Sequence, residues 1–285
     1  MGPRSGRGRH YVSIVIDSIH IVKYASMSNT EYMDGNSKPE QQLSVIQGES
    51  HEAYLERNYR QRANDLISGK ISIEEYIQIE KVERLKLEHQ ATYDSLTELL
   101  NRRGFIDQFD DRIRQYERNL YEATEKAKSD PENTPQILPT TPGPLLMLDM
   151  IEFKKINDSM GHPFGDRVLK AVGKALGDLR PNDIAGRLGG DEFAVFIEGQ
   201  TLEKGLEAAE RIKNLISETI EQDEGFAAGV SIGLAMLPPR GGNFKDVLRE
   251  ADQALYYVKQ STNKNEVGYR RADGQFSIYT TPVQP

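Results

Sequence analysis

Two apolar runs that flank a glycine pair and two carboxylates constrain the fold of this chain most strongly. Residues 184–188 and 193–197 have the composition of β-strands, and Gly189-Gly190 supplies the positive φ angles that a tight turn needs. The sequence therefore predicts a β-hairpin here. The turn alone does not explain Asp191 and Glu192, because neighbouring carboxylates repel each other unless water or a cation neutralises them.

A second acidic segment lies upstream of the hairpin. Residues 145–150 (LLMLDM) form an almost wholly apolar run, which is typical of a buried strand, and Asp149 lies near its carboxyl end. If this strand neighbours the hairpin, Asp149 and Asp191 meet at one edge of a sheet. Paired carboxylates with room for water and phosphate oxygens suit Mg²⁺, so the pattern indicates phosphoryl-transfer chemistry.

Composition excludes several other classes of protein. The 285 residues are 37% apolar, which is enough for one large or two modest cores. A net charge of −8 argues against a nucleic-acid-binding surface, and the lack of cysteine excludes disulfides and thiolate metal sites. No run approaches the ~18 apolar residues of a membrane span. Residues 11–25 contain Asp17, His20 and Lys23, so we expect no signal peptide, no membrane association and a cytoplasmic protein.

The chain divides into three regions by sequence pattern. Residues 1–48 are predicted to be a poorly ordered arm; either the true start is Met27 or Met33, or the arm holds one strand near residues 12–16. Residues 49–92 are predicted to form a helical hairpin, whose second helix begins at a capping box of Ser72 and Glu75. This hairpin is either an input for a partner or a solvated extension.

The remaining residues alternate between helix and strand patterns. Helices are predicted over residues 105–128, 164–180, 202–221 and 244–261, strands over 145–150, 227–237 and 266–270, a further strand near 276–279, and a loop over 129–144. Together with the hairpin, this order predicts an α+β domain with helices packed against a sheet that contains antiparallel strands.

Three motifs occur in the order typical of one family. Residues 94–105 (DSLTELLNRRGF), 149–166 (DMIEFKKINDSMGHPFGD) and 187–193 (RLGGDEF) resemble the GGDEF family of diguanylate cyclases, over roughly residues 92–271. The resemblance implies a palm-like nucleotidyl-cyclase fold over residues 93–280. That fold is a central, mostly antiparallel sheet flanked by helices, here preceded by the helical extension.

The resemblance also implies a reaction and its metal. Such enzymes join two GTP molecules into cyclic di-GMP: each 3′-hydroxyl attacks the α-phosphorus of the other nucleotide, and pyrophosphate leaves twice. Asp149, Asp191, Glu192 and the carbonyl of Met150 match the family's ligands for Mg²⁺ or Mn²⁺. Asp191 and Glu192 match its catalytic positions, and which carboxylate acts as the base is left open.

Substrate contacts follow from the same motifs. Asn157 and Asp166 match the guanine-recognising positions, where a carboxylate can accept hydrogen bonds from guanine N1–H and the 2-amino group. His162 matches a further substrate contact, with helix capping as the simpler alternative. Lys259 matches a phosphate-binding lysine. Lys264 follows after one extra residue in a segment that lacks the family's Gly and Arg, and it offers a point charge without the fork of arginine.

The resemblance also implies a regulatory site at Arg180 and Asp183, in the register of the family's R-x-x-D product-inhibition site, with Asp183 six residues before Gly189. Arg211 matches a second arginine of that site. Arginine can stack on guanine and pair with phosphate, whereas the plainer alternative is a surface ion pair.

We expect an active cyclase that works as a homodimer, because each protomer holds one GTP. One alternative is a catalytically silent receptor for cyclic di-GMP; another is a GTP-binding regulator with weak turnover. The intact carboxylates favour the enzyme.

Overall fold

The computed structural model describes residues 51–129, 141–238 and 242–280. The chain separates into two compact units between Leu85 and Lys86, and each is described by itself. The predicted arm over residues 1–48 and most of the predicted loop over 129–144 lie outside the described residues. Within the described part of the chain, no helix is long and apolar enough to cross a membrane.

The first unit contains the predicted helical hairpin. Helix α3 (His51–Ile67) is followed by a turn and by α4 (Ile73–Thr92), whose last residues belong to the second unit. The capping box is confirmed: the Ser72 amide donates to Glu75 Oε2 at 2.8 Å, and the Glu75 amide donates to Ser72 Oγ at 3.2 Å.

Polar contacts join the two helices of this hairpin. Arg62 of α3 lies 3.3 Å from Glu80 and 2.6 Å from Glu83 of α4. Helix α4 has no fully buried residue. Its large apolar side chains are exposed: Ile73, Ile77, Ile79, Val82, Leu85 and Leu87.

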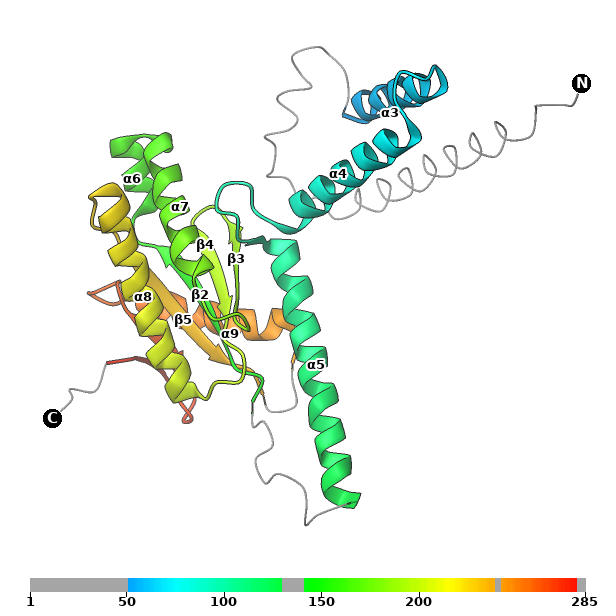
Figure 1. The fold of residues 1–285 in the computed structure, drawn as a ribbon. Coiled ribbons are helices and arrows are strands. Elements are labelled where there is room, and N and C mark those ends of the chain that lie inside the picture. Colours follow the sequence, from blue (N-terminus) through cyan, green and yellow to red (C-terminus); the bar gives the residue numbers. More distant parts are fainter. Residues whose placement is uncertain (1–50, 130–140, 239–241, 281–285) are drawn as a thin grey trace, which may run out of the picture. The chain divides into compact units, whose positions relative to one another are not determined.

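The second unit is built on a seven-stranded sheet in the order β1-β3-β4-β2-β5-β6-β7 (Figure 1). Its strands are β1 (Leu100–Asn101), β2 (Pro144–Met150), β3 (Ile184–Gly189), β4 (Glu192–Phe196), β5 (Val230–Met236), β6 (Val267–Arg270) and β7 (Phe276–Ile278). The β1–β3 and β5–β6 pairs are parallel and the other pairs are antiparallel. The predicted α+β class with a mostly antiparallel sheet is confirmed.

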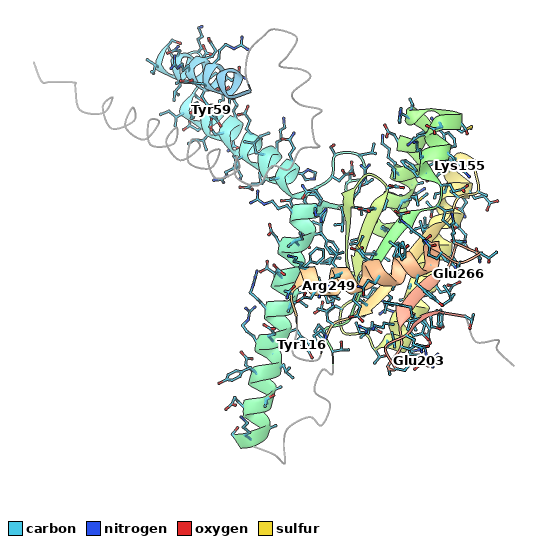
Figure 2. All side chains as sticks on the ribbon, turned by 180° about the vertical axis from the view of Figure 1, so that it is seen from behind. Tyr59, Tyr116, Lys155, Glu203, Arg249 and Glu266 are labelled. Carbon is cyan, nitrogen blue, oxygen red and sulfur yellow. The ribbon has the colours of Figure 1, made fainter. Side chains whose placement is uncertain are left out.

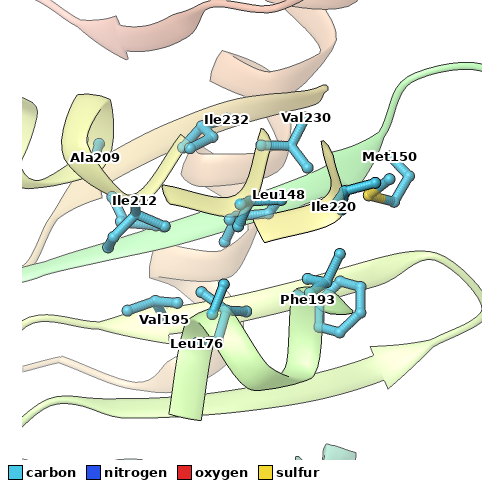
Figure 3. Close-up of a cluster of buried hydrophobic side chains, with 14 of the residues drawn as sticks. Leu148, Met150, Leu176, Phe193, Val195, Ala209, Ile212, Ile220, Val230 and Ile232 are labelled. Atoms are coloured by element: carbon cyan, nitrogen blue, oxygen red, sulfur yellow. The ribbon is translucent and has the colours of Figure 1, made fainter. Parts of the chain in front are cut away.

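Helices cover both faces of this sheet. They are α5 (Arg102–Ser129), α6 (Phe153–Met160), α7 (His162–Gly177), α8 (Leu202–Glu224) and α9 (Phe244–Lys259). Helices α7 and α8 pack on one face, and α5 and α9 pack on the other. The sequence of β2 explains this arrangement, since both faces of the strand are apolar. Leu146 and Leu148 join the cluster under α7 and α8 (Figure 3), whereas Leu145 and Met147 join the cluster under α5 and α9.

Two elements were missing from the sequence prediction. Helix α6 begins after Glu152, which adopts a left-handed conformation with φ 52° and makes no side-chain cap, so the usual start signal is absent. Strand β1 has only two residues, too few for a periodic pattern. The other predicted elements are confirmed, with ends that differ by a few residues.

Candidate active site

The acidic hairpin of β3 and β4 lies beside β2, the central strand of the sheet. Gly189 of β3 pairs with Glu192 of β4, which leaves Gly190 and Asp191 at the tip, and Gly190 has the positive φ of 52° that such a turn requires. In the neighbouring strand, Asp149 lies opposite Glu192. The amide of Met150 donates to the carbonyl of Asp191 at 3.3 Å. The prediction that Asp149 and Asp191 meet at one edge of the sheet is confirmed.

Arg187 fixes the shape of the tip. Its Nε and Nη2 donate to the Gly190 carbonyl at 2.9 and 2.7 Å, and its Nη1 donates to Asp94 Oδ1 at 3.1 Å. Burial acts to raise the pKa of the Asp94 carboxyl, but hydrogen bonds from Thr97 and the Arg187 charge lower it overall. Asp94 and Arg187 belong to separate sequence motifs, and neither motif predicts that the two side chains together support the hairpin.

Lys259 reaches the same carboxylate edge from the last residue of α9. Its Nζ lies 2.7 Å from Asp149 Oδ2, and the Asp149 side chain is only 15% exposed. The lysine that the sequence assigned to substrate phosphates therefore lies beside the carboxylates assigned to the metal. The residues predicted to bind phosphate and metal therefore lie side by side.

Negative charge dominates this region. Burial, and next the Asp149 carboxylate, raise the pKa of Asp191. Partial burial raises the pKa of Glu192, and the Asp149 and Asp252 carboxylates raise it further. The Lys259 charge acts to lower the pKa of both Asp191 and Glu192. Asp252, on α9, was not singled out from the sequence. Because carboxylates outnumber nearby cations, the site favours binding of a further positive charge.

The donor set fits a divalent ion that also binds substrate. Among the described residues, no three His, Cys, Asp or Glu side chains converge into a group able to hold a metal ion. Mg²⁺ usually takes one or two carboxylates and fills its remaining positions with water and phosphate oxygens. Asp149 and Asp191 are two such carboxylates, and their mutual repulsion is what a cation would relieve.

The predicted guanine-binding residues lie on successive helices. Asn157 is on α6, whereas His162 and Asp166 are exposed on α7. Gly165 lies against the Asn157 side chain. Any larger residue at this position would place its Cβ in collision with Asn157 Oδ1. The glycine therefore leaves room for the amide between the two helices. No hydrogen bond joins these side chains in the described structure, so their assignment to guanine stays a prediction.

Lys264 lies in the loop between α9 and β6. Its side chain is exposed. The pKa of Glu152 is lowered mainly by Lys155 and further by Lys264, which places the Lys264 charge near the segment that follows β2. Figure 2 shows Lys155 of α6 and Glu266 of this loop on the same side of the domain. The structure thus places Lys264 at the side of the domain where the Asp149 strand ends.

A separate polar cluster surrounds Asp183. Its Oδ1 accepts the amide of Glu198 at 3.2 Å, and burial raises its pKa against the opposing charges of Arg180, Arg211 and Arg112. The structure therefore brings together the two arginines that the sequence assigned to this site. Arg112 of α5, which lies 3.1 Å from Glu198, is an addition that no local motif indicated.

Comparison with known proteins identifies the second unit. The family model described as "Diguanylate cyclase, GGDEF domain" matches residues 132–265. The chain is 35% identical over 135 residues to "Probable diguanylate cyclase DgcT" of Escherichia coli (strain K12), which covers 46% of this chain and 30% of that protein. It is 34% identical over 184 residues to "Diguanylate cyclase TpbB" of Pseudomonas aeruginosa (strain UCBPP-PA14), which covers 62% of this chain and 37% of that protein. The chain thus spans about a third of the length of these relatives.

A solved structure agrees with this similarity. The coiled coil and GGDEF domain of DgcB from Caulobacter crescentus, in complex with c-di-GMP, is 28% identical to this chain with a TM-score of 0.50. The match covers 67% of this chain and 95% of that one.

Proposed function

Because the chain belongs to the GGDEF family of diguanylate cyclases, we propose that its residues 93–280 join two GTP molecules into cyclic di-GMP and release two pyrophosphates. One observation carries the proposal. Asp149, Asp191 and Glu192 are intact at one sheet edge, and Lys259 lies 2.7 Å from Asp149. This combination suits a metal-dependent reaction on a triphosphate.

The substrate roles follow from residue chemistry. Asp166 accepts hydrogen bonds from guanine N1–H and the 2-amino group, and the Asn157 amide both donates and accepts at the base. His162 provides a further contact. Lys259 and Lys264 bind the triphosphate, which places the α-phosphorus beside the carboxylate edge.

The chemical step needs charge neutralisation and a base. Mg²⁺ or Mn²⁺, held by Asp149, Asp191 and the Met150 carbonyl with Glu192 at the same edge, would neutralise charge on the reacting phosphate. Asp191 and Glu192 are the catalytic carboxylates.

Catalysis requires two protomers, because each active site holds one GTP and the reaction joins two. Product feedback uses the Asp183 cluster, in which Arg180 and Arg211 bind the phosphates and bases of cyclic di-GMP and Asp183 contacts a guanine edge.

A direct assay tests the proposal. Purified protein is incubated with GTP and Mg²⁺ over a range of protein concentrations, and cyclic di-GMP and pyrophosphate are measured by chromatography. A specific activity that rises with protein concentration supports a cyclase that acts as a dimer.

Absence of product together with tight binding of cyclic di-GMP would instead support a receptor. The arginine cluster around Asp183 is the observation that favours this second candidate. The intact Asp149, Asp191 and Glu192 favour the enzyme.

A further inference from the structure

Lys213 is a buried charged residue that none of these roles uses. It lies in α8, and its side chain is only 11% exposed. Its Nζ lies 2.7 Å from Glu210 Oε1 and donates to the backbone carbonyl of Asn265 at 3.2 Å. Burying an ammonium group costs free energy unless its hydrogen bonds are made, and Glu210 and the Asn265 carbonyl supply these partners.

The contacts of Lys213 belong to an anchor for the loop between α9 and β6. Ser231 Oγ of β5 donates to the Lys264 carbonyl at 2.8 Å, and the Val230 amide donates to Asn265 Oδ1 at 3.3 Å. Ser231 is itself buried. Two successive residues of the loop are therefore attached to α8 on one side and to β5 on the other.

This anchor has a consequence for Lys264. The ammonium of lysine is a point charge on a flexible four-carbon stem, so the backbone position of Lys264 sets the region that its charge can reach. The loop carries one residue more than the family pattern and lacks that pattern's glycine and arginine. Fixing the carbonyls of Lys264 and Asn265 compensates for the longer loop, because it holds the Lys264 backbone against the sheet.

We propose that Lys213 is a positioning residue that, through the carbonyl of Asn265, holds Lys264 where it binds the phosphates of GTP. This inference rests on the proposed function for the identity of the substrate. It assigns no contact with the nucleotide to Lys213 itself.

The test compares Lys213→Met with Lys204→Met in the full chain. Methionine keeps most of the length of the lysine side chain but removes the ammonium. Lys204 is a matched control, since it also lies on α8 and pairs with a glutamate three residues away, Glu207, but is exposed. We expect the KM and the Kd for GTP to rise about tenfold in Lys213→Met, with kcat within about twofold of wild type, and no change in Lys204→Met.

Two further variants separate positioning from general stability. Lys213→Arg restores a buried cation and should restore most of the affinity. Ser231→Ala removes the second anchor and should raise KM in the same way, which keeps the test available if Lys213→Met does not fold.

A double-mutant cycle gives the decisive result. If Lys213 acts through Lys264, the Lys213→Met/Lys264→Met protein binds GTP no more weakly than Lys264→Met alone. Independent effects that multiply would overturn the inference, as would wild-type GTP affinity in Lys213→Met. If the wild type binds GTP but makes no product, the proposed function fails while the binding cycle still tests the role of Lys213.

Discussion

Asp191 and Asp183 are two half-buried aspartates of the same domain with opposite electrostatic surroundings. Burial raises the pKa of both. At Asp191 the next largest influence is another carboxylate, Asp149, which raises the pKa further. At Asp183 the neighbouring charges are three arginines, which lower it.

The contrast indicates which kind of ligand each region accepts. The region around Asp191 has too little positive charge, so we expect it to bind a cation and, with that cation, the phosphates of a nucleotide. The region around Asp183 has arginines in excess of carboxylates, so we expect it to bind a phosphodiester without any metal. Synthesis and product binding should therefore respond differently to the same change.

Replacement of both tip carboxylates should give the largest effect. Asp191→Ala with Glu192→Ala is expected to lower kcat for cyclic di-GMP synthesis by about 10³-fold or more, because metal binding and proton transfer fail together. Cyclic di-GMP binding, measured by calorimetry, should stay within about twofold of wild type. Removal of two exposed acids from α8, Glu203→Ala with Glu218→Ala, is the control. Substantial synthesis by the first variant would contradict the catalytic assignment.

Removal of divalent ions should distinguish the Asp191 region from the Asp183 region without any mutation. With EDTA in excess, we expect synthesis to fall to background and to return when Mg²⁺ is added, since the carboxylates then lack their counter-charge. Binding of cyclic di-GMP should persist in EDTA, because arginines supply the charge at Asp183. An equal loss of both activities would remove the distinction between the regions.

Arg180→Ala should show the reverse pattern. Loss of one charge-assisted contact is expected to raise the inhibition constant of cyclic di-GMP about tenfold or more, while the initial rate without product is unchanged. Progress curves with and without added product measure both quantities. The exposed Arg118 of α5 serves as the control in Arg118→Ala. Inhibition that is unaffected by Arg180→Ala would mean that product acts elsewhere.

Asp94→Asn should give the smallest effect. We expect it to lower the stability of the fold, because Asp94 supports the hairpin through Arg187. The loss of the ion pair with Arg187 is expected to reduce the free energy of unfolding by about 1–3 kcal/mol at pH 7. Because the pKa of Asp94 is lowered in the fold, its contribution is complete above its unfolded pKa of about 4 and is lost as pH falls through the folded value.

Urea unfolding at several pH values tests this sign. The difference between wild type and Asp94→Asn should shrink in acid and stay constant from about pH 5 upward. A difference that grows in acid would show that the carboxyl is not stabilised as the anion. Product binding at Asp183 should not change at pH 7.

Local patterns sufficed for much of this fold. The apolar run that ends with Asp149 and the glycine turn before Asp191 each carry their own signal, and the strands form as expected. Helix α6 was missed because its start at Glu152 uses a left-handed residue in place of a capping side chain. Strand β1 is defined by its parallel pairing with β3, and a pairing between segments distant in sequence leaves no local pattern.

The parts of the sites that could not be predicted are pairs distant in sequence. Asp94 supports Arg187, Arg112 joins Asp183 and Lys213 holds Asn265 across different elements. In sequence, Lys213 resembles any solvated lysine of a charged helix; only its burial distinguishes it. The roles in guanine and phosphate binding remain predictions from the family motifs.

Two glycines of the sheet determine how close α9 lies to β5 and β6. A Cβ at Gly233 would collide with the Ala251 carbonyl, and one at Gly268 would lie 2.6 Å from the Ala254 carbonyl. The helix therefore rests directly on the strands, and its last residue, Lys259, meets Asp149. A Gly233→Ala substitution would disturb this packing, and so the position of Lys259. In a mutational survey it would lower activity as an active-site substitution does, although the glycine bears no chemical group that could react. The contact between Lys259 and Asp149 therefore depends on the close packing of helix on sheet as well as on the two side chains themselves.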